Sequence, residues 1–299
     1  MKKDKFHKYF VCAGVCILTI ILTLAVLVSV PVFVCDQFVV SGESMEPTLY
    51  SGDHIFVNKF KLGARIYKDY DFTHTRLKSF RMPSLGKVKV GDIVVFNYPD
   101  AYDRHKIEFR INYVYTKRCI GLPGDTVGIY GGRYSNSSFP RMKMVPAEEE
   151  DVLVNTPDSI IALKKNIYRA FPIKGGLRWT IRNLGPMLVP EKGSTISLDN
   201  SQVYIYARAI EYETGYRPKI SDGRVFIGGK EADSYTFTHN YYFLGGDNVL
   251  NSKDSRYFGV VPEEYIIGVA TRILFSRDPC TGKLIKKRTL KKLSKPDAY

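Results

Sequence analysis

The chain has 299 residues, of which 44% are hydrophobic and 25% charged, so its composition is globular and excludes a disordered or collagen-like chain. Its five cysteines are too few for a disulfide-stapled scaffold of this length. The 44 basic against 30 acidic residues give a net charge of +14, which indicates an anionic partner, either nucleic acid or lipid headgroups.

Most of this positive charge lies at the two ends of the chain. Residues 1–8 carry a net +3 and residues 277–299 a net +6, which together make +9 of the +14. The part between them is only mildly basic, which argues against a nucleic-acid groove across the main domain. We therefore expect membrane lipid, and no nucleic acid, as the anionic partner.

A membrane anchor is predicted for residues 9–34, a stretch of 26 residues without a charged side chain. A helix needs roughly 20 residues to cross the hydrocarbon core, whereas the apolar part of a cleavable signal spans only about 7–15. The run ends in bulky Val-Phe-Val, with Pro31 near its end, so we expect an uncleaved anchor rather than a signal peptide or a buried core helix. The basic residues 1–8 place the N-terminus in the cytoplasm and the rest of the chain on the outer side.

The part after the anchor is predicted to be mainly β. A Gly-Asp turn followed by β-branched or aromatic residues recurs irregularly, which is typical of turns that lead into strands and not of a repeat. Long amphipathic helices are not expected. Strands are predicted at residues 54–57, 93–96, 113–120, 126–129, 202–207, 224–228, 241–244 and 266–275.

The texture of the chain changes between residues 130 and 240, which contain an acidic run at 148–151 and several Gly/Pro-rich phrases. We interpret this stretch as a large inserted, variable subdomain. The predicted division is a basic N-terminus (1–8), an anchor (9–34), two parts of a core (36–129 and 241–276) around the insertion, and a basic C-terminal tail (277–299). The tail either lies on anionic lipid or is a solvated end.

A first chemical segment is Ser41-Gly42-Glu43-Ser44-Met45-Glu46-Pro47-Thr48-Leu49, about ten residues after the anchor. Gly and Pro on either side of Ser44 predict a tight, non-helical loop, which can expose both a hydroxyl and its own backbone N–H. In isolation, a surface turn rich in serine is the commoner explanation of such a segment.

A second chemical segment surrounds Lys117, which lies in an apolar predicted strand. If Lys117 faces the interior, burial disfavours the ammonium form and lowers the pKa of the amine. A neutral lysine can act as general base towards a serine hydroxyl. A lysine at a strand edge that points to water is the alternative.

Together these segments resemble the type I signal peptidases, the membrane-bound Ser/Lys proteases that remove signal peptides. The serine box of that family is similar to residues 41–49, and two further boxes are similar to residues 91–96 and 117–125. The last box is similar to residues 246–259, from Gly246-Asp247 to Phe258-Gly259. The four boxes occur in the family's order behind an N-terminal anchor and cover roughly a quarter of the outer domain, while residues 130–240 match only loosely.

The resemblance implies a role for each matching residue. Ser44 is expected as the nucleophile and Lys117 as the general base, with Ser252 hydrogen-bonded to the lysine. Asp254 and Arg256 are expected to form a structural charge pair beside the site, with Arg118 nearby. The Ser44 backbone N–H would be one oxyanion donor. Some members have a second donor, a serine two residues before the nucleophile; this chain has Gly42 there and Ser41 one place earlier, so the second donor is open.

The implied function is a membrane-bound serine endopeptidase that cleaves signal peptides from exported preproteins through an acyl-enzyme. The implied fold is a β-rich catalytic domain of the signal-peptidase type behind a single transmembrane helix, in the cytoplasmic membrane with the catalytic domain on the outer side. Its partners would be preprotein signal peptides and membrane lipid, and we expect a monomer that uses no cofactor and no metal.

Three alternatives are weighed against this interpretation. A Ser-His-Asp triad would need His54, His105 or His239 to meet Ser44. A Ser/Lys protease of the self-cleaving repressor type disagrees with the predicted anchor. A membrane-anchored, non-catalytic β-domain for adhesion or assembly would leave Ser44 and Lys117 without a shared site.

Overall fold

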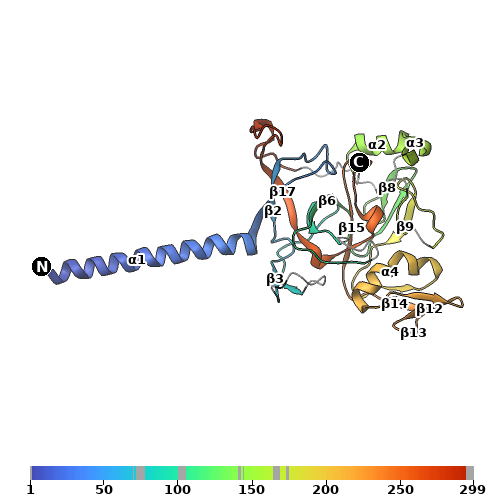
Figure 1. The fold of residues 1–299 in the computed structure, drawn as a ribbon, viewed down its shortest axis with the longest axis horizontal. Coiled ribbons are helices and arrows are strands. Elements are labelled where there is room, and N and C mark those ends of the chain that lie inside the picture. The colour runs from blue at the N-terminus through green and yellow to red at the C-terminus, as the bar shows by residue number, and fades with distance from the viewer. Residues whose placement is uncertain are drawn as a thin grey trace.

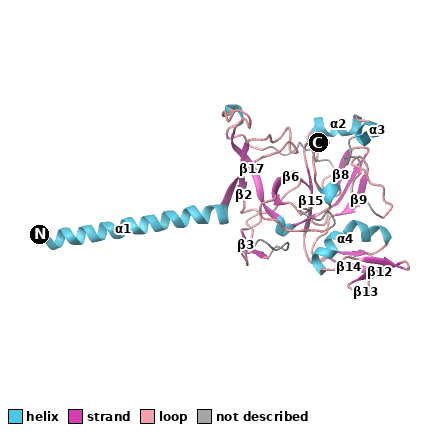
Figure 2. Ribbon diagram, viewed as in Figure 1, coloured by secondary structure: helices cyan, strands magenta, loops and turns pink. Residues whose placement is uncertain are grey.

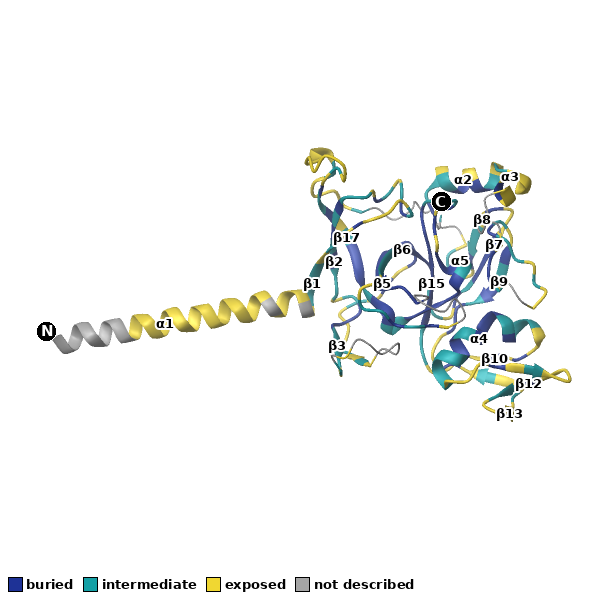
Figure 3. Cartoon of the chain, in the orientation of Figure 1, coloured by how far each residue is buried: buried dark blue, intermediate teal, exposed yellow. Residues whose placement is uncertain are grey.

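The computed structural model describes residues 2–69, 71, 78–99, 106–140, 143, 145–163, 169–172 and 175–293, without the side chains of residues 2–10, 28 and 32. An N-terminal helix projects away from a body that holds all of the strands (Figure 1). This helix, α1 (Lys2–Ser29), runs into a π-helical turn, η1 (Val30–Val34), which contains Pro31. The described apolar side chains between Val11 and Leu27 are exposed (Figure 3). Within the described part of the chain, no helix meets the combined length and hydropathy criteria for a membrane span.

The largest sheet in the described residues has seven strands in the order β1-β2-β17-β5-β6-β15-β16, and its neighbours pair antiparallel. Three β-bulges in the pairings of β17 increase the local twist, and the sheet is curled. Its strands are β1 (Cys35–Val39), β2 (Asp53–Asn58), β5 (Ile93–Asn97), β6 (Val114–Gly121), β15 (Tyr241–Gly245), β16 (Val261–Pro262) and β17 (Ile266–Ser276).

This strand order brings together parts of the chain that are far apart in sequence. β17 lies between β2 and β5, and β15 pairs with β6. The segment that follows β15 therefore lies next to β6, although more than 120 residues separate them. The predicted strands 54–57, 93–96, 113–120, 241–244 and 266–275 are confirmed in this sheet.

Smaller sheets and short helices make up the rest of the body (Figure 2). The predicted strands 126–129 and 224–228 are confirmed here. The strands are β3 (Arg65–Tyr67) with β4 (Ser79–Arg81); β7 (Thr126–Tyr130), β8 (Arg133–Asn136) and β9 (Leu184–Leu188); β10 (Thr195–Ser197) with β14 (Ser234–Thr236); and β11 (Lys219–Ser221), β12 (Arg224–Ile227) and β13 (Lys230–Glu231). The helices are α2 (Ala147–Asn155), α3 (Asp158–Leu163), α4 (Asn200–Thr214), α5 (Ser255–Phe258), η2 (Glu263–Tyr265) and η3 (Lys286–Arg288).

The prediction of a strand at residues 202–207, and of no long amphipathic helix, is wrong. These residues lie in α4, whose N-cap Asp199 accepts hydrogen bonds from the backbone N–H groups of Ser201 and Gln202. Gly215 ends the helix in the left-handed conformation, at a φ of 81°. Val203, Tyr206 and Ile210 are buried at helical spacing, so capping and packing outweigh the β-propensity of the Val-Tyr-Ile-Tyr run.

Two apolar clusters form the core. β5 is buried along its whole length: Val94 and Phe96 belong to the larger cluster, and Ile93 and Val95 to the smaller one. Since successive side chains of a strand point to opposite faces, the sheet is covered on both sides at β5. The smaller cluster also takes in residues of the loop between β1 and β2, which contains Ser44.

Candidate active site

The loop between β1 and β2 presents Ser44 at a fixed place over the sheet. Met45 and Leu49 are buried in the smaller apolar cluster and hold the loop down. The N–H of Leu49 donates to the carbonyl of Met45 at 2.8 Å, and the N–H of Glu46 donates to Glu43 at 3.0 Å. Ser44 itself is half-buried, as the tight-loop interpretation predicts for a hydroxyl that stays accessible.

The segment after β15 supports the same loop from the other side. The N–H of Asn248 donates to the Ser44 carbonyl at 3.2 Å, and the Thr48 hydroxyl donates to Asp247 at 2.5 Å. Asn251 donates to the Glu43 carboxylate at 2.9 Å. Two of the four boxes, 41–49 and 246–259, are therefore in direct contact.

Gly246 allows this contact because there is no room for a side chain. An ideal Cβ at Gly246 would lie 2.0 Å from Ser252 Oγ and 2.6 Å from the Ser44 carbonyl oxygen. We expect Gly246→Ala to push the Ser44 loop outward, to lower activity, and to destabilise the fold by about 1–3 kcal/mol.

Thermal unfolding and peptide cleavage together test the Gly246 prediction. Gly86→Ala is the matched control, because the nearest atoms to its Cβ are at an ordinary 3.6 Å. A Gly246→Ala variant as stable and active as the Gly86→Ala variant would contradict the expected displacement of the loop.

Lys117 lies on β6 with its amine beside Ser44. Its Nζ is 2.5 Å from Ser44 Oγ and 3.2 Å from the Thr116 carbonyl oxygen, and the side chain is 1% exposed. β6 pairs with β5 on one side and β15 on the other, so its central residues are enclosed by neighbouring strands. The serine and the lysine, 73 positions apart in sequence, thus form a hydrogen-bonded pair.

Burial lowers the pKa of Lys117 from its ordinary value of 10.5 to about 8, because the ammonium form is deprived of water. The carboxylates of Asp254 and Asp247 oppose this shift, and Arg256 reinforces it. A substantial neutral fraction of the amine near neutral pH is what a general base requires.

The two nearby carboxylates are each held by an arginine, which limits their pull on the Lys117 proton. Arg256 donates to both Asp254 oxygens, at 2.9 and 2.7 Å, and this charge pair is fully buried. Arg118 donates to both Asp247 oxygens, at 2.7 and 2.5 Å. Arg118 also reaches the Thr48 hydroxyl at 3.2 Å, so it links the lysine strand to the serine loop.

Asp247 is a site residue that the sequence pattern did not reveal, because the resemblance of residues 246–259 to the last box implies no role for it. The expected Asp254–Arg256 pair is present, but Arg118 belongs to a separate pair with Asp247. The sequence does hold one sign of such a role: Asp247 directly follows Gly245 and Gly246 at the end of an apolar strand.

The remaining predicted residues are placed differently around the pair. Ser252 is nearly buried, and its hydroxyl donates to Asp254 at 2.7 Å; the structure records that bond and not one to Lys117. Ser41 is exposed in the segment that precedes the loop, and the recorded contacts of Lys117 do not include it.

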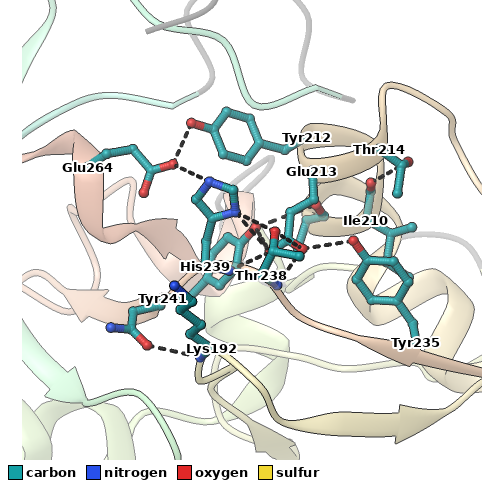
Figure 4. A network of polar contacts seen from close by, with 12 residues as sticks. Lys192, Ile210, Tyr212, Glu213, Thr214, Tyr235, Thr238, His239, Tyr241 and Glu264 are labelled. Carbon is teal, nitrogen blue, oxygen red and sulfur yellow. Dashed lines mark hydrogen bonds and ion pairs between the residues drawn. The ribbon is translucent and has the colours of Figure 1, made fainter. Parts of the chain in front are cut away.

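The histidines that the structure describes have other partners. His54 Nδ1 is 2.7 Å from Gln37 Nε2, and its ring stacks on Phe275. His239 lies between Glu213 and Glu264, at 3.4 Å from each carboxylate, in a polar network on a different part of the body (Figure 4). His105 lies outside the described residues. Neither described histidine contacts Ser44, so a triad gains no support from their positions.

In the described part of the chain the cysteines form no disulfide. Cys119 is buried, with its thiol 3.7 Å from the Gly121 carbonyl oxygen, and Cys280 is exposed. No group of three or more histidine, cysteine or acidic side chains in the described part of the chain is arranged to hold a metal ion.

Comparison with known proteins identifies the family to which the chain is similar. The family model described as signal peptidase, peptidase S26, matches residues 14–137 and 189–275, which together make up more than two thirds of the chain. The unmatched residues 138–188 fall inside the predicted insertion.

The chain is also similar to individual proteins. Signal peptidase I of Buchnera aphidicola subsp. Baizongia pistaciae is 30% identical over 241 residues, covering 79% of this chain and 68% of the relative. Signal peptidase I of Pseudomonas aeruginosa is 29% identical over 256 residues, covering 82% and 66% respectively. A solved signal peptidase I from Enterococcus faecalis aligns with 62% of this chain and 98% of its own, at 19% identity and a TM-score of 0.30. The extent of the family match and the identity to the first of these relatives show that the chain belongs to the signal peptidase family, peptidase S26.

Proposed function

We propose that this serine endopeptidase is a signal peptidase I that removes signal peptides from exported preproteins, with Ser44 as nucleophile and Lys117 as general base. The observation that carries the proposal is the 2.5 Å contact between Ser44 Oγ and the buried Lys117 Nζ. Burial lowers the pKa of this amine to about 8. Family membership supports the reaction class. A non-catalytic adhesion domain would give no reason to keep a buried amine against a serine hydroxyl.

The proposed reaction proceeds by acyl transfer through an ester on Ser44. Neutral Lys117 accepts the Ser44 proton as Oγ attacks the scissile carbonyl carbon, and the resulting ammonium returns the proton to the leaving amine. Lys117 then takes a proton from a water molecule as its oxygen attacks the ester carbon. The bond between that carbon and Ser44 Oγ breaks, the Lys117 ammonium returns the proton to Ser44 Oγ, and the new C-terminus leaves and loses its own proton to solvent. The Ser44 N–H would stabilise the oxyanion, a contribution of about 2.7–4 kcal/mol per donor. Ser41 remains the candidate for a second donor.

The supporting residues are proposed to orient this pair and not to react. Arg118 and Asp247 join β6 to the serine loop through Thr48. Asp254 accepts hydrogen bonds from Arg256, the Gly246 N–H and Ser252, and so fixes the turn that lies against Ser44. No cofactor is needed for this chemistry.

We also propose that residues 9–34 anchor the enzyme in the cytoplasmic membrane, with residues 1–8 in the cytoplasm and the catalytic body outside. The exposed apolar side chains of α1 support this proposal. The ten residues 35–44 span at most about 35 Å, so Ser44 would stay near the membrane surface, where a bilayer-bound signal peptide presents its cleavage site. On this proposal the body, a monomer, contacts membrane lipid, and residues 130–240 form the variable inserted part.

Processing of a precursor in lipid vesicles tests the function. We expect the full chain to cut an exported preprotein once and to release a single mature N-terminus, which mass spectrometry identifies. The same preprotein without its signal peptide is the control and should stay intact. If the full chain leaves the precursor uncut, or degrades both proteins alike, the proposed specificity is wrong.

A further inference from the structure

The basic C-terminal segment, residues 277–293, is docked on the sheet. The chain turns back after β17: Ile285 N–H donates to Ser276 at 2.8 Å, Leu290 N–H to Leu274 at 3.1 Å, and Leu293 N–H to Thr271 at 3.0 Å. Leu293 also packs against the smaller apolar cluster beneath the Ser44 loop. The described part of this segment therefore folds back along β17, although most of its side chains are exposed.

The docked segment places one arginine on the nucleophile loop. Arg288, at the end of η3, donates through Nε to Asp53 Oδ1 at 2.8 Å and through one terminal nitrogen to Asp53 Oδ2 at 2.5 Å. The same nitrogen donates to the Thr48 carbonyl at 3.1 Å, and the guanidinium lies 4.6 Å from the centre of the Tyr50 ring. One guanidinium thus contacts two residues of the loop that carries Ser44 and the first residue of β2.

Asp53 is built to receive this charge. Its side chain is fully buried at the start of β2, and the carboxylate also accepts the Tyr50 N–H at 2.9 Å. Burial alone would raise the pKa of Asp53, but the hydrogen bonds from Arg288, Tyr50 and Ser276, together with the charge of Arg288, hold the pKa below its ordinary value. The backbone of Asp53 closes the loop as well, since Val40 N–H donates to its carbonyl at 2.9 Å.

Thr48 is where the two supports of the loop meet. Its hydroxyl donates to Asp247, which Arg118 holds from the catalytic side. Its carbonyl accepts from Arg288 on the C-terminal side. Thr48 follows Ser44 by only four residues, so the position of Ser44 Oγ relative to Lys117 Nζ depends on both supports.

We infer that Arg288 is a positioning residue, which holds the Asp53–Thr48 part of the loop so that Ser44 stays in reach of Lys117. The inference rests on the proposed function, and it gives the C-terminal segment a part in catalysis beyond its charge. Arg288 touches neither Ser44 nor Lys117, so it acts through the loop alone. Misplacement of a reacting atom by about 1 Å can lower the rate by about 100-fold.

Substitution of Arg288 with chemical rescue tests the inference. We expect Arg288→Ala to lower kcat for precursor cleavage by about 10- to 100-fold and to leave KM near that of the parent enzyme. Guanidinium chloride at millimolar concentration should restore part of kcat, since Arg288 is partly accessible and Asp53 stays behind to bind the ion. Sodium chloride of equal ionic strength should restore none. Arg288→Lys should keep an intermediate kcat, because one ammonium cannot pair with both carboxylate oxygens.

Lys287→Ala is the matched control, since Lys287 is an exposed cation on the same turn and should leave kcat unchanged. A parent-like kcat in Arg288→Ala overturns the inference. The inference is also overturned if kcat falls only in proportion to the fraction of Arg288→Ala that is folded and guanidinium does not restore it. If Arg288→Ala fails to fold, the kcat of Arg288→Lys decides, and a parent-like value overturns the inference. The proposed function fails separately, when the parent enzyme does not cut the precursor or when Ser44→Ala still does.

Discussion

Replacing Ser44 by Ala, or Lys117 by Met, is expected to abolish precursor cleavage, with kcat/KM lower by roughly 10⁴- to 10⁶-fold in each case. Ala at position 44 removes Ser44 Oγ, the proposed nucleophile, which lies 2.5 Å from Lys117 Nζ. Met at position 117 fills the space of the lysine stem but has no amine. Because nucleophile and base act as one unit, the double variant should be hardly slower than either single variant. Cleavage of a labelled precursor by purified enzyme in lipid gives all three rates.

The matched controls are Ser234→Ala and Lys230→Met, since both side chains are exposed on strands of the smaller sheets. Both controls should cleave at the parent rate. Parent-like cleavage by either Ser44→Ala or Lys117→Met would exclude the proposed pair. If only the Lys117 variant stayed active, a different base would have to serve Ser44.

Sequence patterns predicted the strands well where turn chemistry and burial act together. A Gly-Asp turn fixes where β2, β5 and β7 begin, and β-branched side chains then fill a pleated, buried surface. The pattern failed at α4, because Val203 to Tyr206 read as a strand unless the cap at Asp199 is recognised as a helix start. Local propensity gave the wrong answer there, and the Asp199 and Gly215 caps would have given the right one.

The site could be predicted as single residues but not as a network. The box pattern named Ser44 and Lys117, and a lysine in an apolar strand implied burial, which the structure shows at 1% exposure. Which arginine pairs with which carboxylate depends on strand order: Arg118 meets Asp247 because β6 pairs with β15. Arg288 is 235 positions from Asp53, and no local pattern connects two residues at that separation.

Cleavage should depend on pH through the Lys117 amine, the second large effect. The neutral amine is the active form, so kcat/KM, which reports groups of the free enzyme, should rise with pH, reach half of its maximum near the pKa of about 8 and level off above it. At pH 7 about a tenth of the amine is neutral, compared with about 0.03% for a lysine at its ordinary pKa. A rising limb centred near 6.5 would favour a histidine base, and one centred near 10.5 would mean that Lys117 is not buried in the active enzyme.

The same shift has a cost in stability that Lys117→Met should remove. Below pH 8 the unfolded chain holds a proton on Lys117 more tightly than the folded chain does, so the lowered pKa destabilises the fold. A shift from 10.5 to about 8 corresponds to about 3 kcal/mol at neutral pH. The penalty shrinks as pH rises from 8 and vanishes above about 10.5, where the amine is neutral in both states.

We therefore expect Lys117→Met to be inactive yet more stable than the parent in urea at pH 7, with a gain of up to about 3 kcal/mol. The gain should fall towards zero when the comparison is repeated near pH 10.5, whereas the control Lys230→Met should show no pH-dependent gain. This pH-dependent gain is specific to an amine that is both buried and charged at pH 7. An amine that is already neutral, or an ammonium exposed to water, carries no such penalty, so its removal would give no such gain. A difference in stability between Lys117→Met and the parent that is the same at pH 7 and pH 10.5 would contradict the lowered pKa of Lys117, whatever the sign of that difference.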